Sequence, residues 1–130
     1  MKTRLFLAAA GLLMLASGCG SASHRGVEST AEDFYAAAGS GDGAGACALL
    51  APKTRSELEE SAGKECAAAV LEEDIPEVDD LGHSQVYGTM AQVSFSADTA
   101  FLTRFRTGWR IMAVLCSPVP DRPYDCKVSG

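Results

Sequence analysis

Long apolar runs, histidines and catalytic motifs are scarce in this chain of 130 residues. Its longest uncharged apolar run, Leu5–Leu15, falls well short of the roughly 20 residues that a membrane-spanning helix needs. Only His24 and His83 could serve as imidazole ligands, and the cysteines are widely spaced, which argues against zinc. The chain also lacks a C-x-x-C pair, a glycine-rich phosphate loop and a G-x-S-x-G turn. We therefore expect no metal and no cofactor, and an enzyme is not the favoured hypothesis.

Basic residues are in the minority, with 11 Lys and Arg against 17 Asp and Glu and a net charge of −6. Phosphate backbones repel an acidic protein, so nucleic acid is not an expected partner. Ten of the acids lie within residues 57–80, where Lys64 is the single base. The simplest interpretation is that these acids keep solvent-facing helices soluble. The alternative is that they dock beside the more basic C-terminal part of the chain.

The N-terminal segment has the layout of a secretory signal. Lys2 and Arg4 precede the uncharged run, and small residues lead up to Cys19. The small-small-Cys ending resembles the lipobox of bacterial lipoproteins, although Ala16 stands where a leucine is commonest. The resemblance implies that residues 1–18 are removed and that Cys19 receives acyl chains such as palmitate. The bilayer would then be a partner, and the protein would lie on the outer side of the bacterial cell membrane.

An ordinary signal peptide cut nearby is the alternative, and it would leave Cys19 as an odd thiol. Cysteine parity argues against it, because setting Cys19 aside leaves four cysteines, enough for two disulfides in an exported protein. Three pairings are possible. Locality favours the pairs Cys47 with Cys66 and Cys116 with Cys126. A disulfide that closes a loop of this length stabilises a fold by about 3 kcal/mol. Removal of residues 1–18 takes away two positive charges and no acid, so the net charge changes from −6 to −8.

The remaining chain is long enough for one domain. Small polar residues at 20–26 predict a flexible tether, which makes 19–27 the lipidated cysteine with its tether and 28–130 the domain. Ser29 and Glu32 form a capping box that predicts the start of a helix. Its apolar face would consist of Ala31, Phe34, Tyr35 and Ala38, and it would end at Gly39 and Gly41.

Three shorter helices are expected next. Asp42 is a suitable cap for a helix that runs to about Ala51. A second capping box, Thr54 with Glu57, predicts a helix that Gly63 ends. The fourth helix would cover residues 64–73, with Cys66, Ala69 and Val70 on one side.

From Tyr87 onward the apolar pattern has a period of two, which predicts strands at 87–95, 99–105 and 109–115 in an antiparallel meander. Three-residue loops at 96–98 and 106–108 would place every odd-numbered strand residue on one face. Phe105 would then pair with Trp109.

The opposite face would bring Arg104 directly across from Arg110. The two charges repel, so either acids of residues 57–80 or water compensate them, or the pair forms an anion site for carboxylate or phosphate. His83 could act as a general base in a cleft, although a solvated loop histidine is the simpler interpretation. Tyr87 and Trp109 could line a pocket, but large aromatics on a sheet are usually core. The possible ligand-binding residues are thus Arg104, Arg110, Tyr87 and His83.

The order of these elements resembles the nuclear transport factor two-like, or cystatin-like, fold. The resemblance rests on Phe34 and Tyr35 in the first helix and on Gly108–Arg110 in the meander. Residues 42–52 and the sequence DRPYDC at 121–126 resemble small lipoproteins of actinobacteria. This similarity implies an α+β fold, in which short N-terminal helices pack on a curved antiparallel sheet that encloses a conical pocket. Residues 125–128 would add an edge strand.

Two functions are compatible with that fold. The favoured one is a membrane-anchored, non-catalytic binding or protein-interaction module, with an unknown protein or small-molecule partner. The alternative is a small-molecule carrier or enzyme that uses the conical pocket. Pocket volume separates them, because bulky Phe95, Phe101, Phe105 and Trp109 in the concavity would leave no room for a ligand, whereas a cavity with His83, Tyr87 or arginines would favour the alternative.

Overall fold

The computed structural model describes residues 19–130, so the predicted signal segment 1–18 lies outside the described part of the chain. Within residues 19–130 there are four helices and one five-stranded antiparallel sheet, which confirms the α+β class. The elements are α1 (Cys19–Gly39), α2 (Gly43–Leu49), α3 (Pro52–Ala62), α4 (Cys66–Glu72), β1 (Leu81–Tyr87), β2 (Met90–Phe95), β3 (Thr99–Phe105), β4 (Gly108–Val119) and β5 (Arg122–Ser129).

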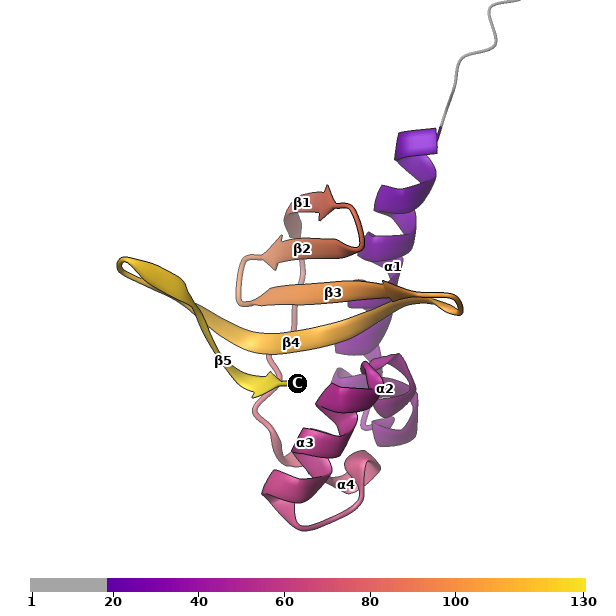
Figure 1. Ribbon diagram of the computed structural model, residues 1–130. Helices are drawn as coiled ribbons and strands as arrows, with labels where there is room; N and C mark the ends of the chain where they lie inside the picture. The colour runs from indigo at the N-terminus through magenta and orange to yellow at the C-terminus, as the bar shows by residue number, and fades with distance from the viewer. Residues whose placement is uncertain (1–18) are drawn as a thin grey trace, which may run out of the picture.

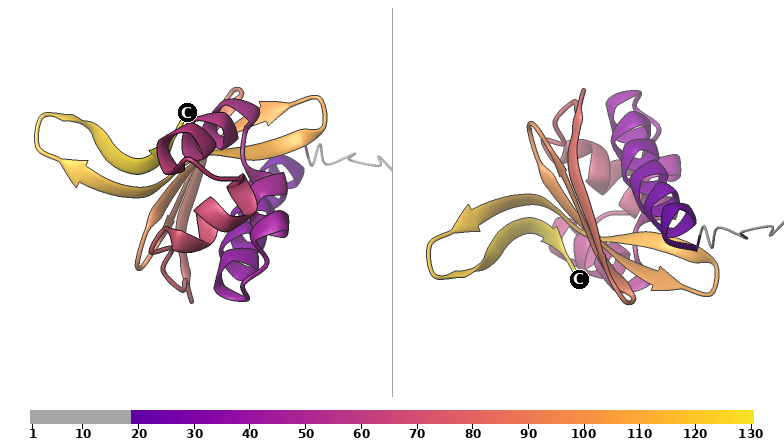
Figure 2. Two further views of the ribbon diagram at one scale, coloured as in Figure 1. Left: turned by 90° about the horizontal axis from the view of Figure 1, so that it is seen from below. Right: turned by 90° about the horizontal axis from the view of Figure 1, so that it is seen from above.

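The sheet is a curved meander in the order β1-β2-β3-β4-β5 (Figure 1). Helix α1 lies against one face of the sheet, while α2 and α3 lie beside β4 and α4 packs on these two helices (Figures 1 and 2). The junction of α2 and α3 runs along the outer edge of β4, where the Ala51 amide donates to the Ile111 carbonyl at 2.7 Å. Beyond this contact β5 pairs with the rest of β4. One edge of the sheet is thus covered, and β1 forms the other edge.

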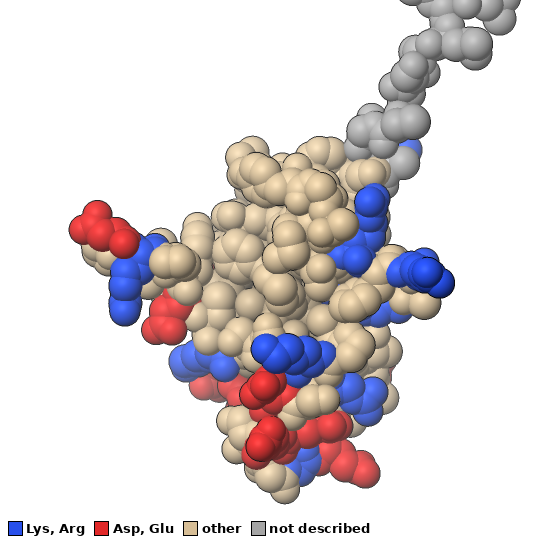
Figure 3. Space-filling model, viewed as in Figure 1, with Lys and Arg blue, Asp and Glu red and all other residues tan. Residues whose placement is uncertain are grey.

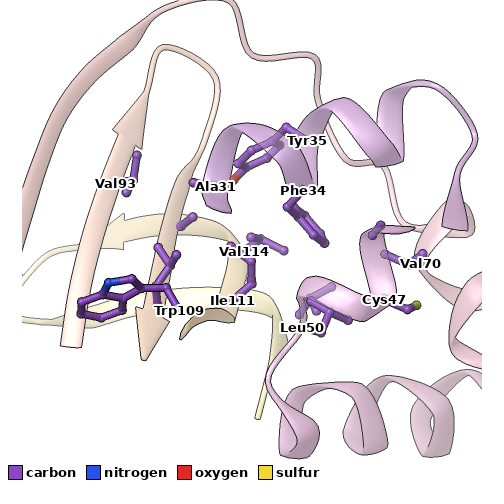
Figure 4. Packing of buried hydrophobic residues seen from close by; sticks show 14 of the residues in the cluster. Ala31, Phe34, Tyr35, Cys47, Leu50, Val70, Val93, Trp109, Ile111 and Val114 are labelled. Atoms are coloured by element: carbon purple, nitrogen blue, oxygen red, sulfur yellow. The ribbon is translucent and has the colours of Figure 1, made fainter. Parts of the chain in front are cut away.

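The core lies between α1 and the sheet (Figure 4). Ala31 and Phe34 are fully buried and Tyr35 almost so, which confirms the predicted apolar face of the first helix. They pack in one cluster with residues of the sheet, among them Val93 and Ile111. Full burial of a side chain as large as phenylalanine contributes about 1.5–3 kcal/mol, so this contact fixes α1 on the sheet.

Helix α1 begins earlier than the sequence predicts. Ser29 lies inside it, where its hydroxyl donates to the Gly26 carbonyl, so the predicted capping box is wrong. Residues 20–26, predicted as a flexible tether, are helical. The reason is Val27, which is fully buried and extends the apolar stripe of Ala31 and Phe34 by one turn toward the N-terminus.

Helix α2 is capped as predicted, since the Asp42 carboxylate accepts from the Gly45 amide at 2.8 Å. Its glycines allow close packing, because a Cβ on Gly43 would lie 2.0 Å from the Ala67 carbonyl oxygen of α4. A glycine that weakens a helix in isolation therefore lets two helices touch. Helix α4 agrees with the prediction to within two residues.

The capping box predicted at Thr54 is wrong. Helix α3 starts two residues earlier, with Pro52 in its first turn, a position where the missing amide costs nothing. Thr54 is fully buried and its hydroxyl donates to the Met112 carbonyl of β4 at 2.9 Å. The residue therefore ties the helix to the sheet rather than capping it. Gly63, with φ of 66°, ends α3 as predicted.

The sheet has five strands, where the sequence predicts a three-stranded meander and an added edge strand. Strand β1 was missed because its apolar residues do not alternate, and Tyr87 ends β1 instead of starting β2. A tight turn pairs Tyr87 with Met90. Strand β5 extends the possible edge strand at 125–128 to eight residues.

The predicted strand register is wrong by one residue. A two-residue loop pairs Phe105 with Gly108, so Trp109 lies opposite Arg104. The buried residues of β3 are therefore even-numbered, as Leu102 is, and those of β2 and of β4 as far as Ala113 are odd, whereas further along β4 Val114 and Cys116 are buried. On the outer face Phe101 packs on Tyr124 of β5, with ring centres 5.1 Å apart.

Two disulfides link neighbouring elements. Cys47 joins α2 to α4 through Cys66, and Cys116 joins β4 to β5 through Cys126. Of the three pairings that four cysteines allow, the structure has the one that locality favours.

Candidate functional site: a cleft between α1 and the edge of the sheet

A cleft among the described residues has a volume of about 540 Å³. It lies between the C-terminal half of α1, the segment that leads into β1, and the end of β2. Its lining residues are Glu32, Tyr35, Ala36, Gly39, Ser40, Glu77, Val78, Asp79, Leu81 and Phe95.

The lining combines an apolar floor with an acidic rim. Tyr35, Val78 and Phe95 supply apolar surface, and Glu32, Glu77 and Asp79 supply carboxylates. Neither Lys nor Arg is among its lining residues in the described part of the chain. A positively charged group with an apolar body fits this combination, because the rim supplies charge-assisted hydrogen bonds.

A buried carboxylate holds the floor of the cleft in place. The Tyr35 hydroxyl donates to Asp98 Oδ2 at 2.7 Å. The same carboxylate accepts from the amide of Thr99, the first residue of β3, at 2.8 Å, and from the amides of Leu115 and Cys116 at 2.9 and 3.0 Å. Asp98 therefore joins α1 to β4, although it lies in the loop between β2 and β3. We call Asp98 and its four donors, Tyr35, Thr99, Leu115 and Cys116, the Asp98 node.

Burial is the main cause that raises the pKa of Tyr35 above its ordinary range. The hydrogen bond to Asp98 and the negative charge of Asp98 raise it further. The phenol consequently stays protonated and keeps donating to the carboxylate at physiological pH. Leu115 has a positive φ of 57°, an unfavourable conformation for a residue with a branched side chain. The hydrogen bond that the Leu115 amide donates to Asp98 Oδ2 stabilises that conformation.

Sequence reasoning missed the role of Asp98 and the cleft itself. The signal at Asp98 was an aspartate at the end of a hairpin loop, a residue type that often hydrogen-bonds backbone amides. Only its partner Thr99 is local; the other amides are 17 and 18 residues further along the chain, and Tyr35 is 63 residues away. Only the tertiary structure brings these groups together.

Two of the predicted site residues lie outside this cleft. His83 is in β1 rather than in a loop, pairs with Ser94 and is exposed. Tyr87 is at the turn between β1 and β2, 62% exposed, and its hydroxyl donates to Gln85. Neither residue lines the cleft, so a general base at His83 has no support there.

The predicted facing pair of arginines is wrong. The register places Arg104 opposite Trp109 and Arg110 opposite Thr103, so the two side chains leave opposite faces of the hairpin. The Arg104 guanidinium lies 5.8 Å from the centre of the Trp109 ring. Arg110 donates to the Trp109 carbonyl at 2.8 Å and borders a smaller cleft of about 290 Å³.

Cys19, the predicted lipidation site, is the first residue of α1, and the structure describes its backbone but not its side chain. Within residues 19–130 no helix is long and apolar enough to cross a membrane. The fold and its bridges define a small, disulfide-linked α+β domain with an open cleft. No protein-family model, curated protein or solved structure matches the chain.

Proposed function

We propose that this protein is an extracytoplasmic lipoprotein, anchored to the outer side of the bacterial cell membrane through acylated Cys19. Its domain acts as a non-catalytic binding or protein-interaction module. The observation that carries the binding role is the cleft, in which an apolar floor and three carboxylates surround a volume of about 540 Å³. The cleft would take a partner group that is both positively charged and apolar, such as a lysine or arginine side chain of another protein.

The disulfides support the proposed location. Two bridges close loops of 19 and 10 residues, and such bonds persist mainly in oxidising compartments. The position of Cys19 adds further support, because only seven residues separate it from the fully buried Val27. A lipid on Cys19 would hold the folded domain close to the bilayer.

We also propose that the domain is nuclear transport factor two-like. The support is the packing of an N-terminal helix on the inner face of a curved antiparallel sheet (Figure 2). Phe34 and Tyr35 of α1 fill much of the concavity together with Trp109, while Phe101 and Phe105 lie elsewhere. The proposed conical pocket is thereby reduced to the cleft beside α1.

The volume of that cleft favours a second candidate, a small-molecule carrier. Small-molecule sites commonly occupy about 300–1,000 Å³, and the cleft falls in this range. A carrier should retain its ligand during purification, so native mass spectrometry separates the two candidates. A bound metabolite that disappears on substitution of Phe95 would favour the carrier.

The anchor is tested on protein isolated from bacterial membranes. We expect the intact mass to include acyl chains on a chain that starts at Cys19, and we expect partition into detergent. Cys19→Ala should lose both properties. Detergent partition without an acyl mass on Cys19 would contradict the proposed anchor.

The cleft is tested with octylammonium, a probe that is cationic and apolar. Titration followed by nuclear magnetic resonance should shift signals of Tyr35 and Phe95. Glu77→Gln with Asp79→Asn should weaken binding, because the rim loses two charges. Glu57→Gln with Glu60→Gln removes the same charge from α3 and serves as the matched control. Equal weakening by both double variants would overturn the assignment of the cleft.

A further inference from the structure

Two hairpin turns lie side by side at one end of the sheet, the turn between β1 and β2 and the turn between β3 and β4 (Figure 1). The Arg104 amide donates to the Thr89 carbonyl at 2.9 Å, which links them directly. We call residues 86–91 and 102–111 together the hairpin end.

The hairpin end exposes large apolar side chains. Tyr87 is 62% exposed, Phe105 42% and Met90 38%. These are half of the six large hydrophobic residues that the described chain leaves exposed, and they come from two adjacent turns. Apolar side chains that gather on a surface commonly mark a contact with a membrane or a partner.

Charge is unevenly distributed between this end and the rest of the molecule. The hairpin end contains Arg104, Arg106 and Arg110 and not one acid, in a chain whose net charge is −6. Acidic side chains gather instead on the end formed by α3 and α4 and at the tip of the hairpin between β4 and β5 (Figure 3). An anionic surface would therefore meet a cationic end of an otherwise acidic protein.

The start of α1 lies at this same end. A Cβ placed on Gly26 would be 3.4 Å from Cδ1 of Trp109, at the base of the hairpin between β3 and β4. His24 Nδ1 lies 3.4 Å from the Ser84 hydroxyl of β1. The first turns of α1 run beside that hairpin when the molecule is seen from above (Figure 2). From Gly26 the helix needs only about 10 Å to reach Cys19.

We infer that the hairpin end rests in the headgroup region of an anionic bilayer. Tyr87, Met90 and Phe105 enter the interface, where aromatic side chains are favoured, and the arginines bind lipid phosphates. The inference rests on the proposed anchor at Cys19, because that lipid would bring this end to the bilayer. The cleft beside α1 would remain free to bind a partner.

The test uses the full chain reconstituted in vesicles of about one-third phosphatidylglycerol, with bromine-labelled acyl chains as quenchers. Phe105→Trp places a reporter in the turn, and the unsubstituted protein supplies the background of Trp109, the single native tryptophan. We expect the new emission to shift to the blue and to be quenched. Neutral vesicles should give weaker quenching.

Arg104→Gln with Arg106→Gln, in the same reporter background, should reduce the quenching by about half or more. Arg122→Gln with Lys127→Gln removes two charges from β5 and is the matched control, with quenching unchanged. Equal loss in both double variants, or no quenching in any vesicle, would overturn the inference. Concentration-dependent quenching between chains, without lipid quenching, would assign the surface to a second copy and overturn it too.

A second measurement keeps the inference testable if the reporter variant does not fold. Hydrogen exchange of the unsubstituted chain should slow in residues 102–110 on anionic vesicles, and unchanged exchange there would contradict lipid contact. The mass at Cys19 is read from the same sample. If the chain is acylated but its hairpin end does not contact lipid, this inference alone is refuted. If the hairpin end contacts lipid but the chain carries no acyl groups, the anchor is refuted.

Discussion

The two ends of the sheet differ in how they are held. At the end with the loop 96–98, the Asp98 node joins α1, β3 and β4, and Cys116 adds a disulfide to β5. At the hairpin end, Tyr87 and Phe105 lie in tight turns with much of their surface in solvent. Buried polar groups and a covalent bond therefore stabilise one end, while the other end leaves large apolar side chains exposed. Surface that contributes little to stability is available for contact with a partner.

Asp98→Ala should have the largest effect on this contrast. It would leave the Tyr35 hydroxyl and the amides of Thr99, Leu115 and Cys116 without their carboxylate acceptor, at a cost of about 3–5 kcal/mol. Urea unfolding followed by circular dichroism measures the loss. Asp98→Asn keeps an acceptor oxygen and should recover part of it. A loss below about 1 kcal/mol for the alanine variant would mean that the node does not stabilise this end.

Removal of the disulfide at the same end should come next. Cys116→Ser with Cys126→Ser opens a loop of 10 residues and should lower the free energy of unfolding by about 3 kcal/mol. Cys47→Ser with Cys66→Ser is the comparison within the helices, with a similar expected loss. If only the Cys47→Ser with Cys66→Ser variant lost stability, the Asp98 node alone would stabilise this end of the sheet.

Tyr35→Phe should cost about 1–2 kcal/mol, because Asp98 loses one donor and keeps its backbone partners. The pKa of Tyr35 is raised in the folded state above its ordinary value of 10.0, chiefly by burial. The stability that this group contributes is thus fully present below about pH 10 and is lost as the pH rises further. Unfolding free energies measured across that range should fall more steeply in the unsubstituted protein than in Tyr35→Phe. Parallel curves would contradict a buried, protonated phenol.

The smallest effect is expected at the hairpin end. Phe105→Ser and Tyr87→Ser should each change the free energy of unfolding by less than about 0.5 kcal/mol, because these side chains are largely exposed. Thermal unfolding in the absence of lipid measures this. A loss of about 2 kcal/mol or more would show that the two residues belong to the fold and would remove the contrast between the ends.

The sequence alone determined what depends on neighbours along the chain. The apolar stripe that contains Ala31 and Phe34, the cap at Asp42 and the stop at Gly63 follow from helix periodicity and local hydrogen bonds. The favoured cysteine pairing follows from short loops for the same reason. Local patterns also gave two wrong predictions. Ser29 and Thr54 fit capping boxes but lie inside helices that Val27 and Pro52 extend toward the N-terminus.

The tertiary structure decided what depends on groups far apart in the sequence. The pairing of Phe105 with Gly108 shifts the strand register by one residue from the predicted one, which moves Arg104 away from Arg110. The Asp98 node unites donors up to 63 residues away, and the cleft beside α1 exists only where the helix meets the sheet edge. Alternation along a strand fixes which residues share a face. It does not fix which neighbour lies opposite, because several registers bury similar apolar area until both faces of the sheet are covered.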